Sequence, residues 1–579
     1  MITEYLSDVA FFALLFFSLV FFHELGHFLM ARFCGVRVEK FSIGMGPAIF
    51  SKKLGDTEYR LAILPLGGYV KMSGDDPSKN YDANEAKIGF LSQHPFKKLL
   101  IVFGGPVFNL ILPIFIFAIM LIVGVPKVES LVGILEDGKP AATAGLEAGD
   151  KVLAVNGQKI SEWQQLEDRI RKSPNQVLGL DVERIDIATG QIKQLNIQVT
   201  PDLSPGKTRF GEDTQVGRIG VGPFFKMPII FFEGSMAAWK EAGVQSLDRV
   251  IKVNDVNIIT LEQLNKALET HGKEGVLRLQ LHRGEAGEIY QAEVKVPEGA
   301  GSVLERLGVQ PVELVVGAVQ KEVQVKEGSR EIVAGPAFLA GLQAGDRLVS
   351  IDGKKLSTWD DVPTSIKAAA GRPFEVAWSR DGKMMSETLL AKSTVLSDPM
   401  MGKDNPLTVT ETPRIGVEPV LKADARFVIE QSYNPIVWVK RGAAETWDLI
   451  TLTGEALGKL VTGQLSLRTL GSPIMIFKVA GNSYRVAGGG QQGWSAFLKT
   501  LMLLSVSLGL VNLFPIPVLD GGHAVLFTLE WIRGRPVSLK VMERLSQVGI
   551  VALMGLFVLV IYNDFVRYHY IDKIVEFFQ

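Results

Sequence analysis

Two pairs of long apolar stretches, one pair near each end of the chain, constrain its fold more than any other feature. Each stretch is long enough to cross, as a helix, a hydrocarbon layer of about 30 Å. The expected spans are residues 9–31, 99–125, 500–518 and 545–562. The sequence therefore predicts a multi-domain integral membrane protein with an α-helical four-span core and a large insert between the second and third spans.

Composition narrows the possible functions. Of the 579 residues, 21% are charged, so soluble domains must accompany the membrane spans, and the net charge of −1 gives no support for nucleic-acid binding. The single cysteine, Cys34, excludes an intrachain disulfide framework and any cysteine-based zinc site. Glu4 and Asp8 stand where a signal peptide would carry basic residues, so we expect the first apolar stretch to be retained.

Loop charge predicts the orientation in the membrane. Eleven Lys and Arg residues lie in the connection 32–98, and four more lie between the last two spans. Cytoplasmic connections carry such an excess of basic residues. We therefore expect both connections on the cytoplasmic side, and both termini and the large insert outside.

The first span contains the motif His23-Glu24-Leu25-Gly26-His27. Two histidines four residues apart lie on one face of a helix, where both can bind a single metal ion, and Glu24 beside them is placed to act as a base. Placing an ionisable side chain in lipid costs free energy, so any explanation of this span must account for three such side chains. The alternative is a short apolar helix with a satisfied polar end.

A catalytic zinc ion usually has three protein ligands. The candidate for the third is Asp520, at the cytoplasmic end of the third span, the depth also expected for the histidines. Pro515 and Pro517 break the helix before it, which frees backbone groups that only a protein-lined or wet cavity tolerates. The alternative is an ordinary Pro-Gly helix end with a surface aspartate.

The second span opens with Gly104-Gly105-Pro106, followed by Asn109. Small residues allow helices to approach closely, and an asparagine can form a hydrogen bond across a helix bundle. A packing interface without chemistry explains these residues equally well.

The insert contains a repeat. Asp150, Asp248 and Asp346 each follow an Ala-Gly turn, and they are 98 residues apart. Equal spacing at domain length predicts three tandem copies of a small mixed α/β sheet domain with a Gly-Asp turn and a following helix, for example 163–170. The middle copy has Leu247 where the other copies have glycine, which favours a spacer over a binding domain.

Taken together, these motifs resemble the site-2 proteases, which are intramembrane zinc metalloproteases, and in particular the RseP type (regulator of sigma-E protease). The resemblance covers both membrane ends and, in kind, an insert with PDZ domains. The matching motifs are 23–27, Gly104-Gly105-Pro106, 66–72, Gly471-Ser472-Pro473-Ile474 and Asn512/Pro515/Asp520-Gly521. Three PDZ-like copies are a departure, because the familiar arrangement has two.

These residues predict the chemistry of the site. His23, His27 and Asp520 are expected to hold one Zn²⁺ per chain, and Glu24 is the expected general base of a zinc metalloendopeptidase. Asn512 is the best nearby donor to a developing oxyanion, a role that the resemblance also implies. A membrane-anchored PDZ scaffold with a non-catalytic metal site and a zinc-dependent transporter are the rival hypotheses. A scaffold does not need Glu24, and a transporter is disfavoured because four spans leave no obvious repeated bundle.

The resemblance also implies partners and location. The substrates would be single-pass membrane proteins already shortened outside by an upstream protease, namely anti-sigma factors of an envelope-stress response or remnant signal peptides. The chain would lie in the bacterial inner membrane, with its PDZ domains on the periplasmic side and its active site toward the cytoplasm. The PDZ array would act either as a size filter or as a receptor for new C-termini.

Further candidate binding residues lie in other stretches of the chain. The stretch 63–72 could offer an edge strand to an unwound substrate or could be a plain structural hairpin. A helix at 446–461 could lie on the outer membrane surface or pack at the base of a domain. The candidates for substrate binding are Gly67, Gly68, Tyr69, Pro515 and Pro517, and those for peptide binding in the PDZ-like copies are Gly149, Asp150, Gly345 and Asp346.

The expected domains follow from these elements. Two membrane halves enclose the three repeats and a connecting region. Their boundaries are 1–126 for the first membrane half, with the loop or hairpin 32–98, then 127–222, 223–312 and 313–420 for the PDZ-like domains, 421–494 for the connecting region and 495–579 for the second membrane half.

Overall fold

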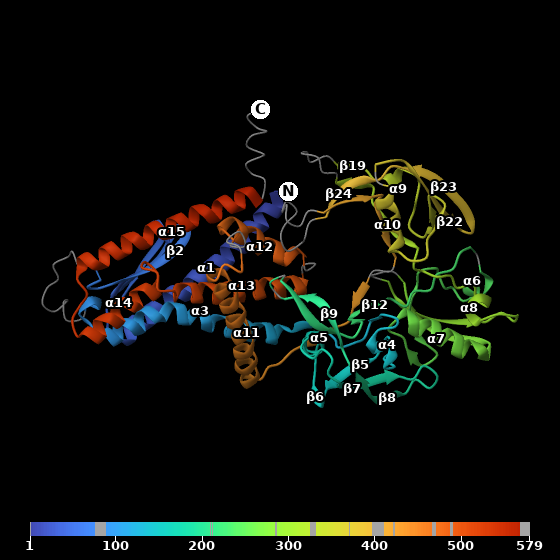
Figure 1. The fold of residues 1–579 in the computed structure, drawn as a ribbon, viewed down its shortest axis with the longest axis horizontal. Helices are drawn as coiled ribbons and strands as arrows, with labels where there is room; N and C mark the ends of the chain where they lie inside the picture. The colour runs from blue at the N-terminus through green and yellow to red at the C-terminus, as the bar shows by residue number, and fades with distance from the viewer. Residues whose placement is uncertain are drawn as a thin grey trace. The chain divides into compact units, whose positions relative to one another are not determined.

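The described residues form two compact units in the computed structural model. One unit contains residues 2–126 and 430–567 and is mainly helical, and the other contains 127–396 and 410–429 and is rich in strands (Figure 1). The residues that the structure describes are 2–75, 89–208, 210, 212–234, 236–283, 287–324, 332–369, 371–396, 410–420, 423–465, 471–486 and 490–567.

The helical unit contains the membrane spans. Within the described residues, four helices are long and apolar enough to cross a membrane by length and composition, which confirms the predicted number. The candidate spans are Leu6–Phe33, Pro95–Val123, Gly490–Asn512 and Lys540–Phe565.

The bounds of the third span were predicted wrongly. The helix was expected at 500–518, but it runs from Gly490 to Asn512. It ends early because a residue that precedes proline is pushed away from helical backbone angles, and Pro515 and Pro517 follow. It begins early because one face of its added first turns packs inside the unit, where Gly493, Ser495 and Phe497 are buried.

Two shorter helices of this unit, α12 and α14, were not predicted. Helix α12 packs against α1 and α13, and α14 packs against α3. Strands β3 (Val125–Val128) and β28 (Phe427–Glu430) lie where the chain passes from one unit to the other. The elements of the helical unit are α1 (Ile2–Phe33), β1 (Val38–Leu54), β2 (Thr57–Met72), η1 (Phe90–Ser92), α3 (Pro95–Val123), α11 (Pro435–Val461), α12 (Pro473–Val486), α13 (Gly490–Asn512), α14 (Asp520–Arg533) and α15 (Leu539–Arg567).

Helices α1 and α3 meet at two glycines. A methyl group added to Gly26 would overlap the backbone of Gly104, and one added to Gly104 would lie 2.9 Å from the backbone carbon of Gly26. The expectation that the small residues at the start of the second span allow close helix approach is therefore confirmed. Away from the crossing, Leu15 and Phe117 are fully buried in the shared core.

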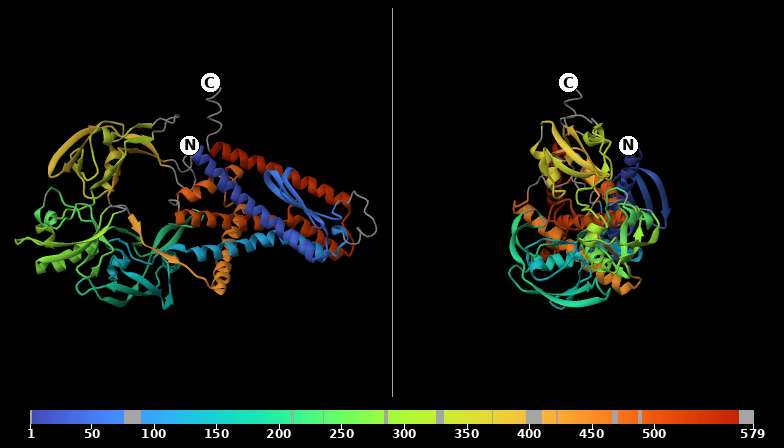
Figure 2. Two further views of the ribbon diagram at one scale, coloured as in Figure 1. Left: turned by 180° about the vertical axis from the view of Figure 1, so that it is seen from behind. Right: turned by 90° about the vertical axis from the view of Figure 1, so that its right-hand side faces the viewer.

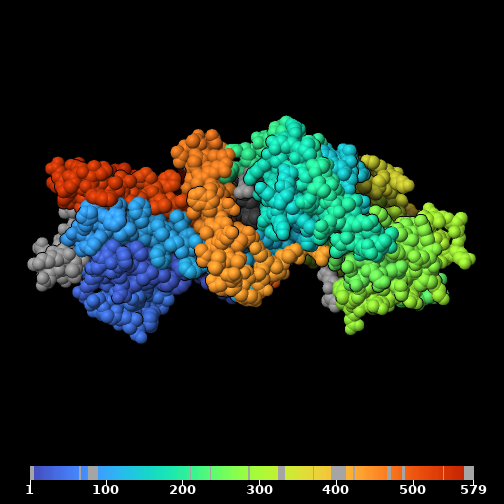
Figure 3. Space-filling model, turned by 90° about the horizontal axis from the view of Figure 1, so that it is seen from below, coloured from blue at the N-terminus to red at the C-terminus, as the bar shows by residue number. Residues whose placement is uncertain are grey.

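Helix α11 contains the helix expected at 446–461 but begins at Pro435, where Asn434 caps its first turn. It runs across α3, as the orange and light-blue segments in Figure 3 show. Its small residues face inward: Gly442 lies against the backbone of Ile114, whereas Trp447 is 64% exposed. The helix thus packs within the helical unit and leaves an apolar face outward.

The connection after α1 folds into the hairpin β1–β2, which lies along α1 (Figure 2). Its strands are irregular, and β1 residues 40–43 pair both with residues 58–61 and with residues 68–71 of β2. Residues 76–88 of this connection lie outside the described residues.

The strand-rich unit repeats one arrangement three times. Each copy is a four-stranded antiparallel sheet with the same strand order, namely β6-β5-β7-β8, β14-β13-β15-β16 and β21-β20-β22-β23, and each has its own hydrophobic core. A helix follows the first hairpin of each sheet, as expected from the first copy. The predicted threefold repeat is therefore present in the structure.

The repeated elements differ mainly after the sheet. In the first and third copies a hairpin follows, and in the middle copy the short helix α8 replaces it.

The first copy contains β4 (Ile134–Leu135), α4 (Pro140–Thr143), β5 (Lys151–Val155), β6 (Gln158–Lys159), α5 (Trp163–Arg171), β7 (Leu178–Ile185), β8 (Ile192–Val199), β9 (Asp202–Lys207), β10 (Asp213–Arg218) and β11 (Val221–Gly222), and β12 (Phe224–Lys226) follows it. The middle copy contains α6 (Ala237–Glu241), β13 (Arg249–Val253), β14 (Val256–Asn257), α7 (Leu261–His271), η2 (Gly272–Glu274), β15 (Val276–His282), β16 (Ile289–Lys295) and α8 (Val303–Arg306).

The third copy contains β17 (Val316–Val319), β18 (Glu322–Gln324), β19 (Ile332–Ala334), α9 (Pro336–Leu339), β20 (Arg347–Ile351), β21 (Lys354–Lys355), α10 (Asp361–Ala368), β22 (Phe374–Arg380), β23 (Lys383–Leu389), β24 (Lys392–Leu396), β25 (Thr410–Arg414) and β26 (Val417–Pro419), and β27 (Ala423–Ala425) follows it.

The repeated aspartate is buried in every copy. Asp346 accepts hydrogen bonds from Nε and Nη2 of Arg380 at 2.6 and 2.7 Å and from the backbone N–H of Gln343 at 2.8 Å. Asp150 pairs in the same way with Arg184 of β7, and Asp248 pairs with Arg283, which directly follows β15. In each copy this ion pair connects the turn that carries the aspartate to the sheet.

Replacing Asp346 by Ala is expected to destabilise the third copy by about 1.5–3 kcal/mol, because Arg380 and the Gln343 N–H lose a buried charged acceptor. Faster hydrogen exchange of β22 in the full chain measures the effect, and exposed Lys383→Ala is the control. Unchanged exchange together with lost peptide binding would instead support the peptide-binding role expected for Asp346.

Candidate functional site

Three side chains from two distant parts of the chain meet in the helical unit. His23 and His27 project from α1, and Asp520 is the first residue of α14. Nε2 of His23 lies 3.4 Å from Oδ2 of Asp520, Nε2 of His27 lies 3.5 Å from Oδ1, and the two Nε2 atoms are 3.3 Å apart. The structure thus brings together the three residues predicted to bind metal.

These separations fit a zinc ion. Ligand atoms about 2.1 Å from a tetrahedral ion lie roughly 3.4 Å from one another, and zinc accepts imidazole nitrogen and carboxylate oxygen. The cluster leaves a fourth position without a protein ligand among the described residues, as in catalytic rather than structural zinc sites.

Glycines make room for this cluster. A methyl group added to Gly105 of α3 would lie 2.7 Å from Cε1 of His23 and 2.8 Å from Cε1 of His27. Gly521 and Gly522 of α14 likewise pack against backbone carbonyls of the loop 513–519, which a side chain would prevent. The histidine rings and the start of α14 can therefore approach only because these positions lack side chains.

Helix α14 is held against α3 by a buried ion pair. Nζ of Lys98 donates to Oε1 of Glu530 at 2.8 Å, and Phe527 packs below it.

At the start of the helix, burial raises the pKa of Asp520, but hydrogen bonds from His23 and His27 outweigh burial and hold that pKa well below its usual value. Asp520 therefore stays an anion, the form that binds metal.

Glu24 lies beside the cluster and is only 8% exposed. The hairpin β1–β2 covers it: a methyl group added to Gly68 would lie 2.7 Å from Cγ of Glu24. Gly67 has φ +85°, a conformation that favours glycine, and Tyr69 accepts a hydrogen bond from Arg60 at 3.1 Å. The structure thus places the predicted substrate-binding stretch next to the predicted base.

The remaining predicted residues lie in and around the loop before α14. Asn512 is the last residue of α13 and is half-buried. Pro515 is exposed, and the carbonyl of Pro517 lies against Gly549 of α15. Their roles stay predictions.

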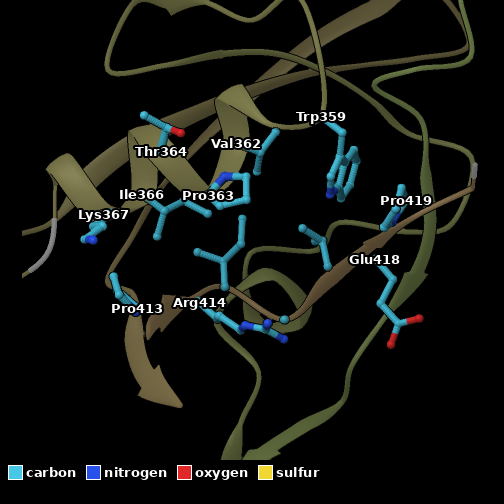
Figure 4. A pocket seen from close by; sticks show the side chains of 13 residues that line it. Trp359, Val362, Pro363, Thr364, Ile366, Lys367, Pro413, Arg414, Glu418 and Pro419 are labelled. Atoms are coloured by element: carbon cyan, nitrogen blue, oxygen red, sulfur yellow. The ribbon is translucent and has the colours of Figure 1, made fainter. Parts of the chain in front are cut away.

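The strand-rich unit carries a groove that the sequence analysis missed. In the third copy, a cavity of about 460 Å³ lies between α10 and residues 413–419, with Val362 and Ile366 on the helix side (Figure 4). In the first copy, a cavity of about 260 Å³ lies between α5 and residues 217–223.

A sequence signal marks both grooves. Arg218-Ile219-Gly220-Val221 and Arg414-Ile415-Gly416-Val417 are identical and lie two repeat lengths apart. The evenly repeated Asp150 and Asp346 were the predicted peptide-binding residues, but the grooves lie at these later motifs.

In the middle copy, α8 packs against α7, the counterpart of α5 and α10. Glu269 of α7 accepts hydrogen bonds from the backbone of Val303 and Leu304 in α8, at 3.1 and 2.9 Å. Trp239, fully buried, stands where the other copies have Ala141 and Ala337, and it donates to the carbonyl of Leu307. The role of the middle copy as a spacer stays a prediction.

Comparison with known proteins places the chain in a family. The model of peptidase family M50 matches residues 11–556. The chain is 29% identical over 567 residues to the regulator of sigma-E protease RseP of Escherichia coli, covering 97% of this chain and 99% of that one. It is 28% identical over 551 residues to protease RseP of Yersinia pestis, covering 95% and 96%.

A further relative, from Neisseria meningitidis, is provisionally named a zinc metalloprotease and is 27% identical over 558 residues, covering 95% of this chain and 96% of that one. These matches extend across both membrane ends and the insert, and they agree with a metal-binding cluster inside a helical membrane unit. The resemblance found in the sequence is thereby confirmed: the chain belongs to peptidase family M50 and is a zinc metalloendopeptidase of the site-2 protease type.

Proposed function

We propose that this protease cuts the transmembrane segments of single-pass membrane proteins, using one zinc ion per chain held by His23, His27 and Asp520. The observation that carries the proposal is the triangle of ligand atoms 3.3–3.5 Å apart, beside the buried Glu24 and within the candidate membrane unit. When bound, zinc supplies a Lewis acid that activates water and polarises the peptide carbonyl.

The chain's own residues complete the reaction. Glu24 takes a proton from the attacking water and returns it to the leaving amine. Asn512, at the end of α13, donates a hydrogen bond to the developing oxyanion. Both ligand histidines keep their positions because α3 packs against them through Gly105.

An unwound substrate pairs with the hairpin β1–β2. Residues 68–70 pair with β1 on one side, and the register gives them no second strand among the described residues. An edge strand can take an extended peptide by main-chain hydrogen bonds, and Gly68 lies against Glu24. Gly67, Gly68 and Tyr69 therefore hold the substrate beside the base, and the proline loop at Pro515 and Pro517 borders the same site.

The strand-rich unit selects substrates outside the cytoplasm. We assign it to the periplasmic side of a bacterial inner membrane, with the active site toward the cytoplasm, as loop charge predicts. Its three copies are PDZ-like domains with the predicted boundaries, and the grooves of the first and third support peptide binding. The substrates are anti-sigma factors or remnant signal peptides already cut by an upstream protease.

Removing zinc tests the metal assignment. Treatment of the purified chain with a strong chelator is expected to abolish cleavage of a model single-pass substrate, and one equivalent of zinc per chain is expected to restore it, because each chain has one three-residue ligand cluster among its described residues. Metal analysis measures the stoichiometry. Full cleavage by zinc-free protein would contradict the assignment.

Substrate length tests the selection role. The parent is expected to cut a substrate that lacks its outer domain and to spare the full-length form, whereas a chain without residues 127–420 is expected to cut both. Gel analysis of the cleavage products measures the two rates. If the deleted chain still spares the full-length substrate while it cuts the shortened one, the array is not a size filter.

A further inference from the structure

Asn109 lies in α3 directly opposite the histidine pair and is fully buried. Its side-chain amide lies 3.2 Å from Nδ1 of His23. On the other side, α13 packs against the residue: Oγ of Ser505 donates to the backbone carbonyl of Asn109 at 2.7 Å, and Gly509 lies against its side chain. The amide is therefore held at one ring nitrogen of one predicted ligand.

In a histidine that binds metal through one ring nitrogen, the hydrogen bond made by the other ring nitrogen affects metal affinity. Both histidines direct Nε2 toward Asp520, so Nδ1 must carry the proton when Nε2 binds metal. A hydrogen-bond acceptor at Nδ1 then fixes the tautomer and the ring orientation. For His27 that acceptor is the backbone carbonyl of Ile101, 2.9 Å from Nδ1. For His23 the corresponding group is the amide of Asn109.

The amide orientation in the structure suits the metal-free tautomer. Nδ2 of Asn109 faces Nδ1 of His23, while Oδ1 is buried without a hydrogen-bond partner among the described residues. The two amide atoms are alike in size, so a half-turn about the last side-chain bond exchanges them without moving a neighbour. The half-turn places the acceptor Oδ1 at Nδ1, as a metal-bound His23 requires.

We propose that Asn109 is a positioning residue of the zinc site: in the metal-bound form its Oδ1 accepts the Nδ1 proton of His23 and so presents Nε2 to the ion. This inference rests on the proposed zinc site. The two ligand histidines are then oriented by different kinds of group. Ile101 orients His27 through a backbone carbonyl, which no substitution removes, whereas Asn109 orients His23 through its side chain.

The test measures metal affinity in the full chain in detergent. Asn109→Leu keeps the approximate size but removes the acceptor, and we expect it to lower zinc affinity by about 10–100-fold, measured by competition with a chromogenic chelator. Asn109→Asp keeps an acceptor at the same place and is expected to retain more of the affinity than Asn109→Leu. Ser505→Ala is the matched control, because it removes a hydrogen bond to the backbone carbonyl of Asn109 but leaves the side-chain amide opposite His23.

A second readout separates positioning from packing. With cobalt(II) in place of zinc, the visible absorption reports ligand geometry, so Asn109→Leu is expected to change the spectrum and Ser505→Ala to keep it. Parent-like zinc affinity in Asn109→Leu would overturn the inference and leave the zinc site intact. Equal losses in Asn109→Leu and Ser505→Ala would also overturn it, in favour of simple packing. A parent chain that binds no zinc would overturn the metal site itself.

Discussion

Replacing Glu24 by Gln is expected to lower the rate of substrate cleavage by about 10²–10⁴-fold, the usual contribution of a general base. The amide cannot take a proton from water, but it has nearly the shape of the carboxylate, so the packing of Gly68 against this side chain persists. Zinc content is expected to stay at the parent level, because Glu24 is not one of the three clustered ligands. Purified protein, a single-pass substrate without its outer domain and metal analysis suffice for the measurement.

Two outcomes would contradict this assignment. Equal cleavage by parent and variant would mean that another group is the base or that another protease contaminates the preparation. Loss of zinc together with activity would mean that Glu24 holds the metal site together. His23→Ala serves as the matched comparison, since it is expected to lose both metal and activity.

The metal site was predictable from sequence because each half of it is a local pattern. The spacing of His23 and His27 places both on one helix face, and the prolines before Asp520 predict a helix break. What the sequence did not reveal is that Asp520 begins a helix, α14. That helix is short and carries Glu530 and His523, and its position depends on packing against Lys98 and on two glycine contacts, none of which leaves a periodic signal.

The strand-rich unit shows a different limit. Even spacing revealed three copies, yet the most regular residues, the aspartates, are buried in ion pairs rather than exposed for binding. The grooves lie where a helix meets a strand that is distant in sequence, so only the fold identifies them. Helix α12 was not predicted for a different reason. Lys478 and Arg485 make it too polar to be recognised as a membrane segment.

Gly105→Ala is expected to impair the enzyme although residue 105 carries no chemistry. The new methyl group would lie 2.7 Å from Cε1 of His23 and 2.8 Å from Cε1 of His27, closer than unbonded carbon atoms approach. Since α3 is pinned to α1 at the Gly26–Gly104 crossing, the imidazole rings must move instead. A displacement of about 1 Å at a catalytic group can cost about 10²-fold in rate, and we expect zinc affinity to fall with it.

The helix itself gives no reason for such a loss, because alanine is a better helix former than glycine by about 1 kcal/mol. Gly555→Ala in α15 provides the matched control: the same substitution in a candidate membrane helix meets no atom within 4 Å. Cleavage rate and zinc affinity are expected to fall in Gly105→Ala and to stay at the parent level in Gly555→Ala. If Gly105→Ala kept both properties, the histidine pair would have room that this structure does not show, and a glycine would not be needed to seat the metal ligands.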